Sequence, residues 1–210
     1  MARNFYIATA GTMGSGKTTV ARLISQKLNC HLLLENFEEN RFLPRFYKNM
    51  ARWAFHSQTF FLLEKISQMF ETKELLKKTA VIQDTVIFQD VFSYAKAQFV
   101  LGNMDQAEFS LYTKIYASFV DQLPQPDLIV YLKAPVRTLQ QRIKRREKSV
   151  NKNPSLSYLK TLDQLNRQWV EKQARGRVLF FDAQKNNFAL DQKQRQQLID
   201  KIKDKLKNKK

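Results

Sequence analysis

The chain has 210 residues, 43% hydrophobic and 26% charged, and its 36 Lys and Arg against 19 Asp and Glu give a net charge of +17. This length predicts one domain, 1–210, with a sizeable core. The sequence contains no run of about 18 apolar residues, so we expect no membrane-spanning helix. Cys30 is the only cysteine, which excludes an intrachain disulfide and a cysteine-based zinc site. Because no signal-peptide pattern precedes the first apolar run either, we expect a cytoplasmic protein.

A glycine-rich segment at 11–18, GTMGSGKT, lies between a short apolar run, 5–10, and an amphipathic helical pattern. This order of strand, glycine loop and helix is the context that a phosphate-binding P-loop requires. Backbone N–H groups of such a loop, together with the helix N-terminus, attract a polyphosphate. Lys17 is expected to contact the β- and γ-phosphates of ATP, and Thr18 to contact Mg²⁺. The predicted ATP-binding residues are Gly11, Thr12, Met13, Gly14, Ser15, Gly16, Lys17, Thr18 and Thr19.

Two later apolar runs each stop at a carboxylate. Residues 31–34 end at Glu35, and residues 80–83 end at Asp84. Each run is typical of a short buried strand, so both carboxylates are expected at the edge of a sheet. A carboxylate that ends a strand commonly completes the metal site of a P-loop protein, and Asp84 with Thr18 is therefore the expected Mg²⁺ site.

A long helical pattern lies between these two strands, at 50–78. It follows a polar segment, 36–49, in which aromatic residues are interleaved and Pro44 interrupts any long helix. Gln58 and Lys65 fall on the apolar stripe of the helix. A buried amide must find partners or cost roughly 1–3 kcal/mol. Gln58 therefore either bonds to backbone groups or faces a pocket in which a ligand supplies the partners.

The second half of the chain continues to alternate helices with strands. Its predicted elements are, in order, helices at 86–100 and 105–123, a strand at 127–132, a helix after Pro135, a helix at 158–175, a strand at 178–181 and a helix at 191–206. This alternation predicts an α/β fold, a five-stranded parallel sheet flanked by helices on both faces. Aromatic residues form a stripe along 105–123, which is usual for a core or for a dimer face.

Two segments carry much of the positive charge. Residues 137–152 contain seven basic residues and one acid, and Arg142 and Arg146 share a helix face because they are four residues apart. Guanidinium groups neutralise a transferring phosphoryl group, so we predict an Arg-rich lid at about 142–152. The last residues, 201–210 (KIKDKLKNKK), are expected to form a solvated helix end rather than a nucleic-acid arm.

These motifs together resemble the deoxynucleoside kinases, and within them the bacterial deoxyadenosine/deoxyguanosine kinase branch. The most specific part is ENFEENRFL at 35–43, followed by the residues 46–47, 52–55 and Gln58. The segment LPQPDLI at 123–129 and the arginine lid match as well, so the resemblance covers almost the whole chain. It implies a P-loop kinase that uses ATP and Mg²⁺ to phosphorylate the 5′-hydroxyl of a deoxynucleoside, most often a purine one, as a homodimer.

The resemblance also implies roles at the acceptor. Glu35 would be the general base that takes the proton of the 5′-hydroxyl, and Tyr47 would hold the 3′-hydroxyl. Gln58 and Asp90 would recognise the base. Lys65 stands near the base and the general-base carboxylate, at a position where an arginine is common in the family.

At the phosphates, the resemblance implies that Arg142 and Arg146 act as lid clamps beside Lys17, and that Asp84 helps to hold Mg²⁺. The loop 182–187 matches the segment that flanks the adenine of ATP. Besides Lys65, the chain departs from the family pattern at three positions: Thr85, Lys148 and Asn151. These departures bear on catalytic efficiency and base preference, because lysine does not replace arginine at a bidentate contact, and they leave the reaction class unchanged.

Two alternative functions stay open. A nucleoside monophosphate kinase of the thymidylate type would need further cations for the acceptor phosphate, and four are near: Arg41, Arg45, Lys48 and Arg52. The carboxylate of Glu35 counts against it, because a monophosphate oxygen needs little help from a base. A P-loop nucleotide-binding protein with reduced kinase activity could instead bind nucleic acid through the basic lid and tail. We expect ATP and a deoxynucleoside as partners, and neither nucleic acid nor a membrane.

Overall fold

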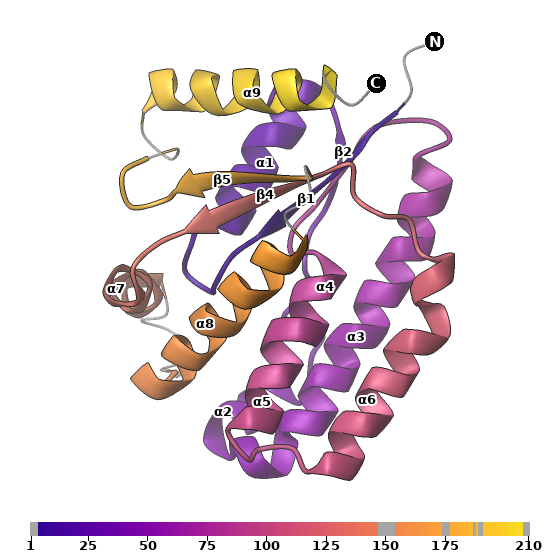
Figure 1. Cartoon of the computed structure of the whole chain (residues 1–210), viewed down its shortest axis with the longest axis vertical. Helices are drawn as coiled ribbons and strands as arrows, with labels where there is room; N and C mark the ends of the chain where they lie inside the picture. The colour runs from indigo at the N-terminus through magenta and orange to yellow at the C-terminus, as the bar shows by residue number, and fades with distance from the viewer. Residues whose placement is uncertain (1–3, 147–153, 174–176, 187, 189–190, 208–210) are drawn as a thin grey trace.

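The computed structural model describes residues 4–146, 154–173, 177–186, 188 and 191–207. Within them, five strands form one parallel sheet in the order β2-β3-β1-β4-β5 (Figure 1). The strands are β1 (Tyr6–Ala10), β2 (His31–Leu33), β3 (Val81–Gln83), β4 (Leu128–Lys133) and β5 (Val178–Asp182). Each lies where the sequence predicts a strand, so the α/β fold with a five-stranded parallel sheet is confirmed.

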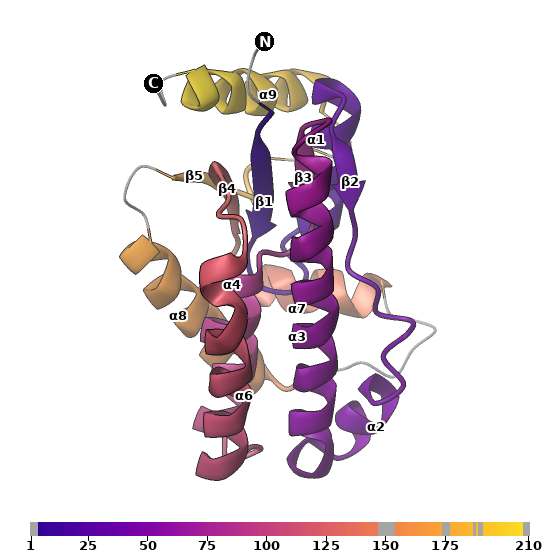
Figure 2. The same cartoon turned by 90° about the vertical axis from the view of Figure 1, so that its right-hand side faces the viewer.

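Helices cover both faces of the sheet. In chain order the α-helices are α1 (Lys17–Leu28), α2 (Leu43–Lys48), α3 (Met50–Leu75), α4 (Ile87–Gln89), α5 (Lys96–Val100), α6 (Gln106–Phe119), α7 (Val136–Arg146), α8 (Leu156–Gln173) and α9 (Gln192–Lys207). A π-helical turn, η1 (Asp90–Ala95), joins α4 to α5, and a 3₁₀ turn, η2 (Val120–Gln122), follows α6. Figure 2 shows α3 running beside α6 away from the sheet, toward α2 at the far end.

The side chains of the strands feed two cores, because successive residues of a strand point to opposite faces of the sheet. Ile7 of β1 and Val130 of β4 pack with residues of α1 and α9. Tyr6 of β1 and Tyr131 of β4 pack instead with residues of α3, α6 and α8. The sheet is therefore buried on both sides, as its almost continuous apolar strands require. None of the described helices is both long and apolar enough to cross a membrane.

The segment from Ile87 to Val100 is helical throughout, but it is not the single regular helix that the sequence predicts. The π-helical turn η1 lies in its middle and begins at Asp90. Such turns are rare and are frequent at functional sites. The short helix α2 was not predicted at all, and Pro44 lies in its first turn, where proline is tolerated.

The aromatic stripe of α6 lies in the core of this chain. Tyr112 and Tyr116 are buried, and Phe109, Ile115 and Phe119 pack against the same cluster of residues from α3 and the sheet. The helix begins at a capping box in which Asp105 accepts from the N–H of Glu108 and the Glu108 side chain accepts from the N–H of Asp105. The expectation that the stripe packs into the core is thus confirmed for this chain.

The expectation of a solvated C-terminal helix end is wrong for part of α9. Ile202 is fully buried between α9 and the sheet, and Leu206 packs against the same core. Lys201 lies over the ring of Phe181, 5.7 Å from its centroid. Lys201, Lys203, Lys205 and Lys207 are exposed, but the apolar residues between them continue the buried stripe of Leu198 and Ile199. Residues 208–210 lie outside the described part of the chain.

This burial predicts that α9 contributes to stability through Ile202. Replacing Ile202 with alanine should lower the free energy of unfolding by about 2–5 kcal/mol, because the lost methylene groups leave a cavity under the helix. Urea denaturation followed by circular dichroism measures the change. Lys203→Ala, at the exposed neighbouring position, is the control and should shift the free energy of unfolding by no more than about 0.5 kcal/mol. Equal midpoints for the two variants would contradict the prediction.

Candidate active site

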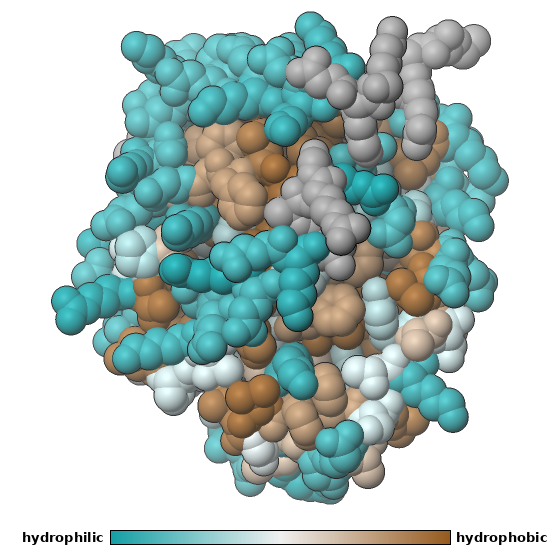
Figure 3. Space-filling view, viewed as in Figure 1, coloured by the Kyte–Doolittle hydropathy of each residue, from teal (hydrophilic) through white to brown (hydrophobic). Residues whose placement is uncertain are grey.

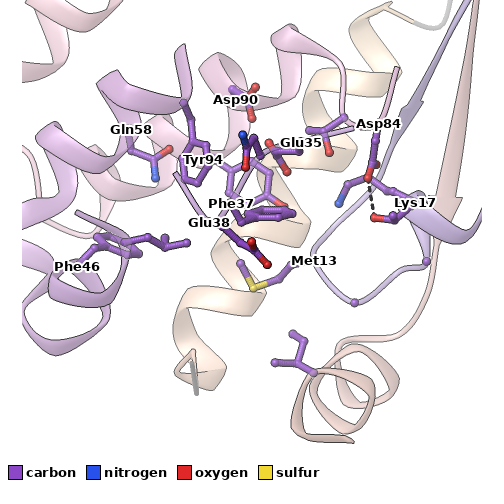
Figure 4. A pocket seen from close by; sticks show the side chains of 18 of the residues that line it. Met13, Lys17, Glu35, Phe37, Glu38, Phe46, Gln58, Asp84, Asp90 and Tyr94 are labelled. Carbon is purple, nitrogen blue, oxygen red and sulfur yellow. Dashed lines mark hydrogen bonds between the residues drawn. The ribbon is translucent and has the colours of Figure 1, made fainter. Parts of the chain in front are cut away.

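A cavity of about 610 Å³ lies beyond the carboxyl ends of β1, β2 and β3, where a doubly wound α/β sheet usually binds its ligands (Figure 4). Its wall is formed by the P-loop, the segments after β2 and β3, and side chains of α2, α3, η1, α7 and α8. Twelve of the predicted site residues line it: Met13, Gly14, Gly16, Lys17, Thr18, Thr19, Glu35, Tyr47, Gln58, Asp84, Asp90 and Arg142. The structure thus brings together the predicted phosphate, metal and substrate residues. Four further predicted residues do not line the cavity and lie behind its wall: Gly11, Thr12, Ser15 and Lys65.

The P-loop has the backbone geometry that only glycine adopts without strain. Gly11, Gly14 and Gly16 have φ angles of 138°, 82° and 99°. A side chain on Gly11 would also place its Cβ 2.5 Å from the carbonyl oxygen of Leu132, on the neighbouring strand β4. Gly16 caps α1, so the free N–H groups of that helix start at the cavity. The Lys17 ammonium donates to the Gly11 carbonyl oxygen at 2.9 Å.

Two other elements hold the start of the P-loop. The carboxamide of Gln89, on α4, accepts from the N–H of Gly11 at 2.9 Å and donates to its carbonyl at 2.7 Å. The hydroxyl of Thr12 donates to Asp163 and accepts from Asn166, both on α8, at 3.1 Å each. The loop is therefore fixed by side chains as well as by its own glycines.

The predicted metal ligands lie next to each other. The Thr18 hydroxyl donates to Asp84 Oδ2 at 2.5 Å, and the Thr9 hydroxyl donates to Asp84 Oδ1 at 3.2 Å. Mg²⁺ is commonly bound by one or two protein oxygens while phosphates and waters complete its shell. One carboxylate and one hydroxyl beside a phosphate loop fit that mode of binding.

Lys65 is a buried cation at the back of the site. Only 2% of its side chain is exposed, and its ammonium donates to the backbone carbonyl of Asp84 at 3.0 Å. The same ammonium lies 3.8 Å from Glu35 Oε1. Lys65 thus does not line the cavity itself but contacts two residues that do, Glu35 through its carboxylate and Asp84 through its backbone carbonyl.

Burial raises the pKa of both Glu35 and Asp90. For Glu35, desolvation raises the pKa, Lys65 lowers it, Asp84 raises it and Lys17 lowers it, and desolvation is the largest effect. The pKa of Asp90 lies well above its usual range, again mainly because of desolvation, with Lys65 as the strongest opposing charge. Perturbed carboxyl groups in a cavity are typical of functional sites.

The end of the cavity away from the P-loop combines polar and aromatic side chains. Figure 4 shows Gln58 and Asp90 reaching into it from neighbouring helices, with Tyr94 and Glu35 between them and the P-loop. Asp90 Oδ2 is buried and has no hydrogen-bond partner within the described residues. A buried acceptor and a buried amide at one end of a cavity are suited to a planar ligand with polar edges.

The Arg-rich lid is described only in part. Arg142 on α7 donates to the carbonyl oxygens of Ala183, at 2.7 Å, and Ser15, at 3.4 Å, so it bridges the P-loop and the segment after β5. In that segment the Asp182 carboxylate accepts from the N–H groups of Gln184 and Lys185. Arg146 ends α7, and its side chain is not described. Lys148, Asn151 and residue 187 lie outside the described part of the chain.

Several lining residues were not among the predicted site residues. Half of them are aromatic: Phe37, Phe46, Phe61, Tyr94 and Tyr158. The aromatic residues interleaved in 36–49 were a usable signal for the first two. Tyr94 had no such signal, because the π-helical turn that carries it departs from the regular helical period. Gln89, Asp163 and Asn166 bond to the P-loop from behind the cavity wall. No local sequence pattern marks these residues, because each contact joins segments that are far apart in the chain.

The four cations that a monophosphate kinase would need do not line the cavity. Arg41, Arg45, Lys48 and Arg52 are all exposed. Arg45 and Arg52 stack on the ring of Trp53, at 5.0 and 5.4 Å from its centroid. This surface cluster gives no cationic site for a second phosphate.

A parallel α/β sheet, a P-loop with its lysine, a paired hydroxyl and carboxylate, and a strand-end glutamate facing the same cavity define a P-loop phosphotransferase. The family model described as "Deoxynucleoside kinase" matches residues 7–207. The chain belongs to the deoxynucleoside kinase family, whose members are ATP-dependent phosphotransferases. The resemblance seen in the sequence is thereby confirmed.

Individual relatives agree with this assignment. The chain is 35% identical to a deoxyguanosine kinase of Bacillus subtilis (strain 168) over 159 residues, which are 75% of this chain and 74% of that protein. It is 29% identical to a deoxyadenosine/deoxycytidine kinase of the same organism, over 80% of this chain and 77% of that one. A solved structure of deoxyadenosine kinase from M. mycoides, with the products dCMP and a flexible dCDP bound, matches with a TM-score of 0.82. It is 26% identical and the match covers 95% of this chain and 99% of that one.

Proposed function

We propose that the protein transfers the γ-phosphate of ATP to the 5′-hydroxyl of a deoxynucleoside, and that deoxyadenosine or deoxyguanosine is its preferred acceptor. One observation carries the proposal: the P-loop, Glu35, and the polar pair of Gln58 and Asp90 line a single cavity. Relatives named deoxyguanosine kinase and deoxyadenosine/deoxycytidine kinase support the choice of acceptor.

Glu35 acts as the general base in this proposal. It follows β2 after one intervening residue, lies in the cavity wall between Lys17 and the acceptor end, and has the ammonium of Lys65 at 3.8 Å. A raised pKa makes the ionised carboxylate a stronger proton acceptor, while Lys65 favours the ionised form. Lys17 and Arg142 neutralise charge that develops on the phosphoryl group, aided by Arg146 of the lid.

Thr18 and Asp84 would hold Mg²⁺, because their hydroxyl and carboxylate meet at the edge of the P-loop. A bound Mg²⁺ supplies charge neutralisation for the triphosphate and orients its oxygens. Thr9 then orients the carboxylate of Asp84 from the strand β1 side. The backbone of Asp84 is in turn fixed by Lys65.

Gln58 and Asp90 recognise the base, and Tyr47 holds the sugar. An amide offers donors and an acceptor together, and a carboxyl with a strongly raised pKa also offers both when it is neutral. Adenine and guanine present neighbouring donors and acceptors on their edges, which this pair complements. The aromatic side chains of Phe46, Phe61 and Tyr94 supply apolar walls for a flat ring.

The proposal is tested by turnover with each of the four deoxynucleosides in the presence of ATP and Mg²⁺. We expect kcat/KM for deoxyadenosine or deoxyguanosine to exceed that for thymidine by at least about tenfold, which corresponds to the net free energy of about one hydrogen bond. A coupled assay for ADP release provides the measurement. Strong thymidine turnover with weak turnover of both purines would overturn the proposed preference.

We further propose a cytoplasmic homodimer. The helices α3, η1 and α6 expose four large apolar side chains, which support a dimer interface on these helices: Leu63, Phe70, Phe92 and Leu111. Sedimentation velocity measures the mass of the protein in solution and should give twice the mass of one chain. Figure 3 shows hydrophobic side chains over the lower helices and hydrophilic ones over α9 at the top.

The nucleic-acid alternative predicts a salt-dependent shift of short DNA at the protein concentrations used for turnover.

A further inference from the structure

Gln89 contacts the P-loop from the element that carries the acceptor end of the site. It is the last residue of α4, is fully buried, and is followed in the chain by Asp90. Its carboxamide makes both possible contacts with one peptide residue, accepting from the Gly11 N–H at 2.9 Å and donating to the Gly11 carbonyl at 2.7 Å. The Lys17 ammonium bonds to the same carbonyl at 2.9 Å.

The local backbone explains why a side chain is needed there. Gly11 lies just after β1, beyond the last residues that pair with β3 and β4. Its N–H and carbonyl are buried and require partners. A primary amide is the side chain group that offers a donor and an acceptor in one plane, as a neighbouring peptide would. Gln89 therefore takes the place of a strand partner at the first residue of the phosphate loop.

We propose that Gln89 is a positioning residue that couples the P-loop to Asp90, so that ATP and the deoxynucleoside bind cooperatively. The inference rests on the proposed function, because it assumes that the Asp90 end of the cavity holds the acceptor. Gln89 and Asp90 are consecutive residues, and the π-helical turn begins between them. A movement of Gly11 around bound phosphates is passed through two hydrogen bonds to the backbone that aims the Asp90 carboxyl. Lys17, which bonds to the same Gly11 carbonyl, links that movement to the phosphates themselves.

The experiment compares Gln89→Met with Gln98→Met. Methionine matches glutamine in length but forms neither hydrogen bond with Gly11. Gln98 is a fully buried glutamine on α5 of the same helical stretch, and its carboxamide accepts from the Asn103 side chain at 3.0 Å. The control therefore removes a buried amide from the same segment without touching the P-loop. Thermal denaturation of both variants first establishes that each one folds.

Calorimetric titration gives the affinity for a non-hydrolysable ATP analogue with and without saturating deoxynucleoside. In the unchanged protein we expect each ligand to tighten the other by at least about fivefold, the lower end of usual coupling between sites. Gln89→Met should bring this factor close to one and raise KM for both substrates, while Gln98→Met keeps the factor. A role for Gln89 in stability alone would lower the melting temperature and leave the coupling factor unchanged.

The outcomes separate this inference from the proposed function. An unchanged protein that phosphorylates deoxynucleosides but shows no coupling, or a Gln89→Met variant that keeps the coupling, overturns the role of Gln89 alone. An unchanged protein that phosphorylates no deoxynucleoside overturns the proposed function, and the inference with it.

Discussion

Replacement of Glu35 with glutamine is expected to lower kcat by at least about a hundredfold, the usual range for loss of a general base. The variant keeps the shape of the side chain and can still accept a hydrogen bond, but it cannot take the proton of the 5′-hydroxyl. The P-loop and the Thr18–Asp84 pair are untouched, so ATP affinity should not change. Turnover by a coupled assay and ATP titration together provide the measurement.

Glu39→Gln is the matched control, because Glu39 is exposed and lies outside the cavity wall. It should keep the kcat of the unchanged protein. The pH dependence offers a second check, since only ionised Glu35 can act as a base and burial raises its pKa above the ordinary 4.5. We expect activity to fall with decreasing pH at a higher pH than an unperturbed glutamate would cause. A glutamine variant with near-normal kcat would remove Glu35 from the role of base.

Replacement of Gly11 with alanine should destabilise the protein and distort the P-loop. The new Cβ would meet the carbonyl oxygen of Leu132 at 2.5 Å, and the φ of 138° is itself unfavourable for alanine. Backbone strain and forced repacking contribute about 1–3 kcal/mol each, so we expect the free energy of unfolding to fall by about 2–6 kcal/mol. The clash is with main chain on β4, which cannot rotate away as a side chain would. ATP binding and turnover should fall with it.

Gly102→Ala separates strain from collision. Gly102 also has a positive φ, 72°, but no atom lies within 4 Å of its added Cβ. This control should cost only the left-handed backbone penalty, about 1–2 kcal/mol. Denaturant unfolding of both variants measures the difference. If the two substitutions cost the same free energy, the close approach of Leu132 is not what requires a glycine at position 11.

Sequence alone located the strands and the carboxylates at their ends because these two features share one cause. A parallel strand buried on both faces is continuously apolar, so the first carboxylate after it marks where the strand leaves the core. Glu35 and Asp84 both follow this rule, and both line the cavity. The P-loop was equally visible, since its glycines, lysine and threonine are needed at fixed spacing.

Depth within a helix could not be predicted in the same way. Gln58 and Lys65 share one stripe of α3, yet Gln58 lines the cavity while Lys65 lies behind it. Their different positions depend on where β2 and β3 end relative to α3, which no local pattern encodes. Asp90 was proposed from the resemblance. The π-helical turn that orients it was not predicted, because a regular period of 3.6 residues was assumed for the whole segment.

In the C-terminal helix the sequence does contain the pattern of a buried stripe, but the abundance of lysines favoured the prediction of a solvated helix. Leu198, Ile199 and Ile202 follow the three- and four-residue spacing of a buried stripe. The lysines around them dominate the composition of the segment, and composition is a poor guide where a helix has two different faces. The long stems of such lysines also cover apolar surface, as Lys201 does over Phe181.

The contacts of Arg142, Asp163 and Asn166 have a consequence for the length of the lid. Arg142 bonds to the Ser15 carbonyl, and the two α8 residues bond to Thr12, so both ends of the intervening chain are attached to one short loop. In polymer terms, these contacts close a ring, because α7 and α8 are both joined to the P-loop. The entropy of closing such a ring grows only logarithmically, by about 0.6 kcal/mol for each doubling of a flexible loop. Insertions between α7 and α8 should therefore be tolerated, whereas a deletion that prevents either end from reaching the P-loop should not.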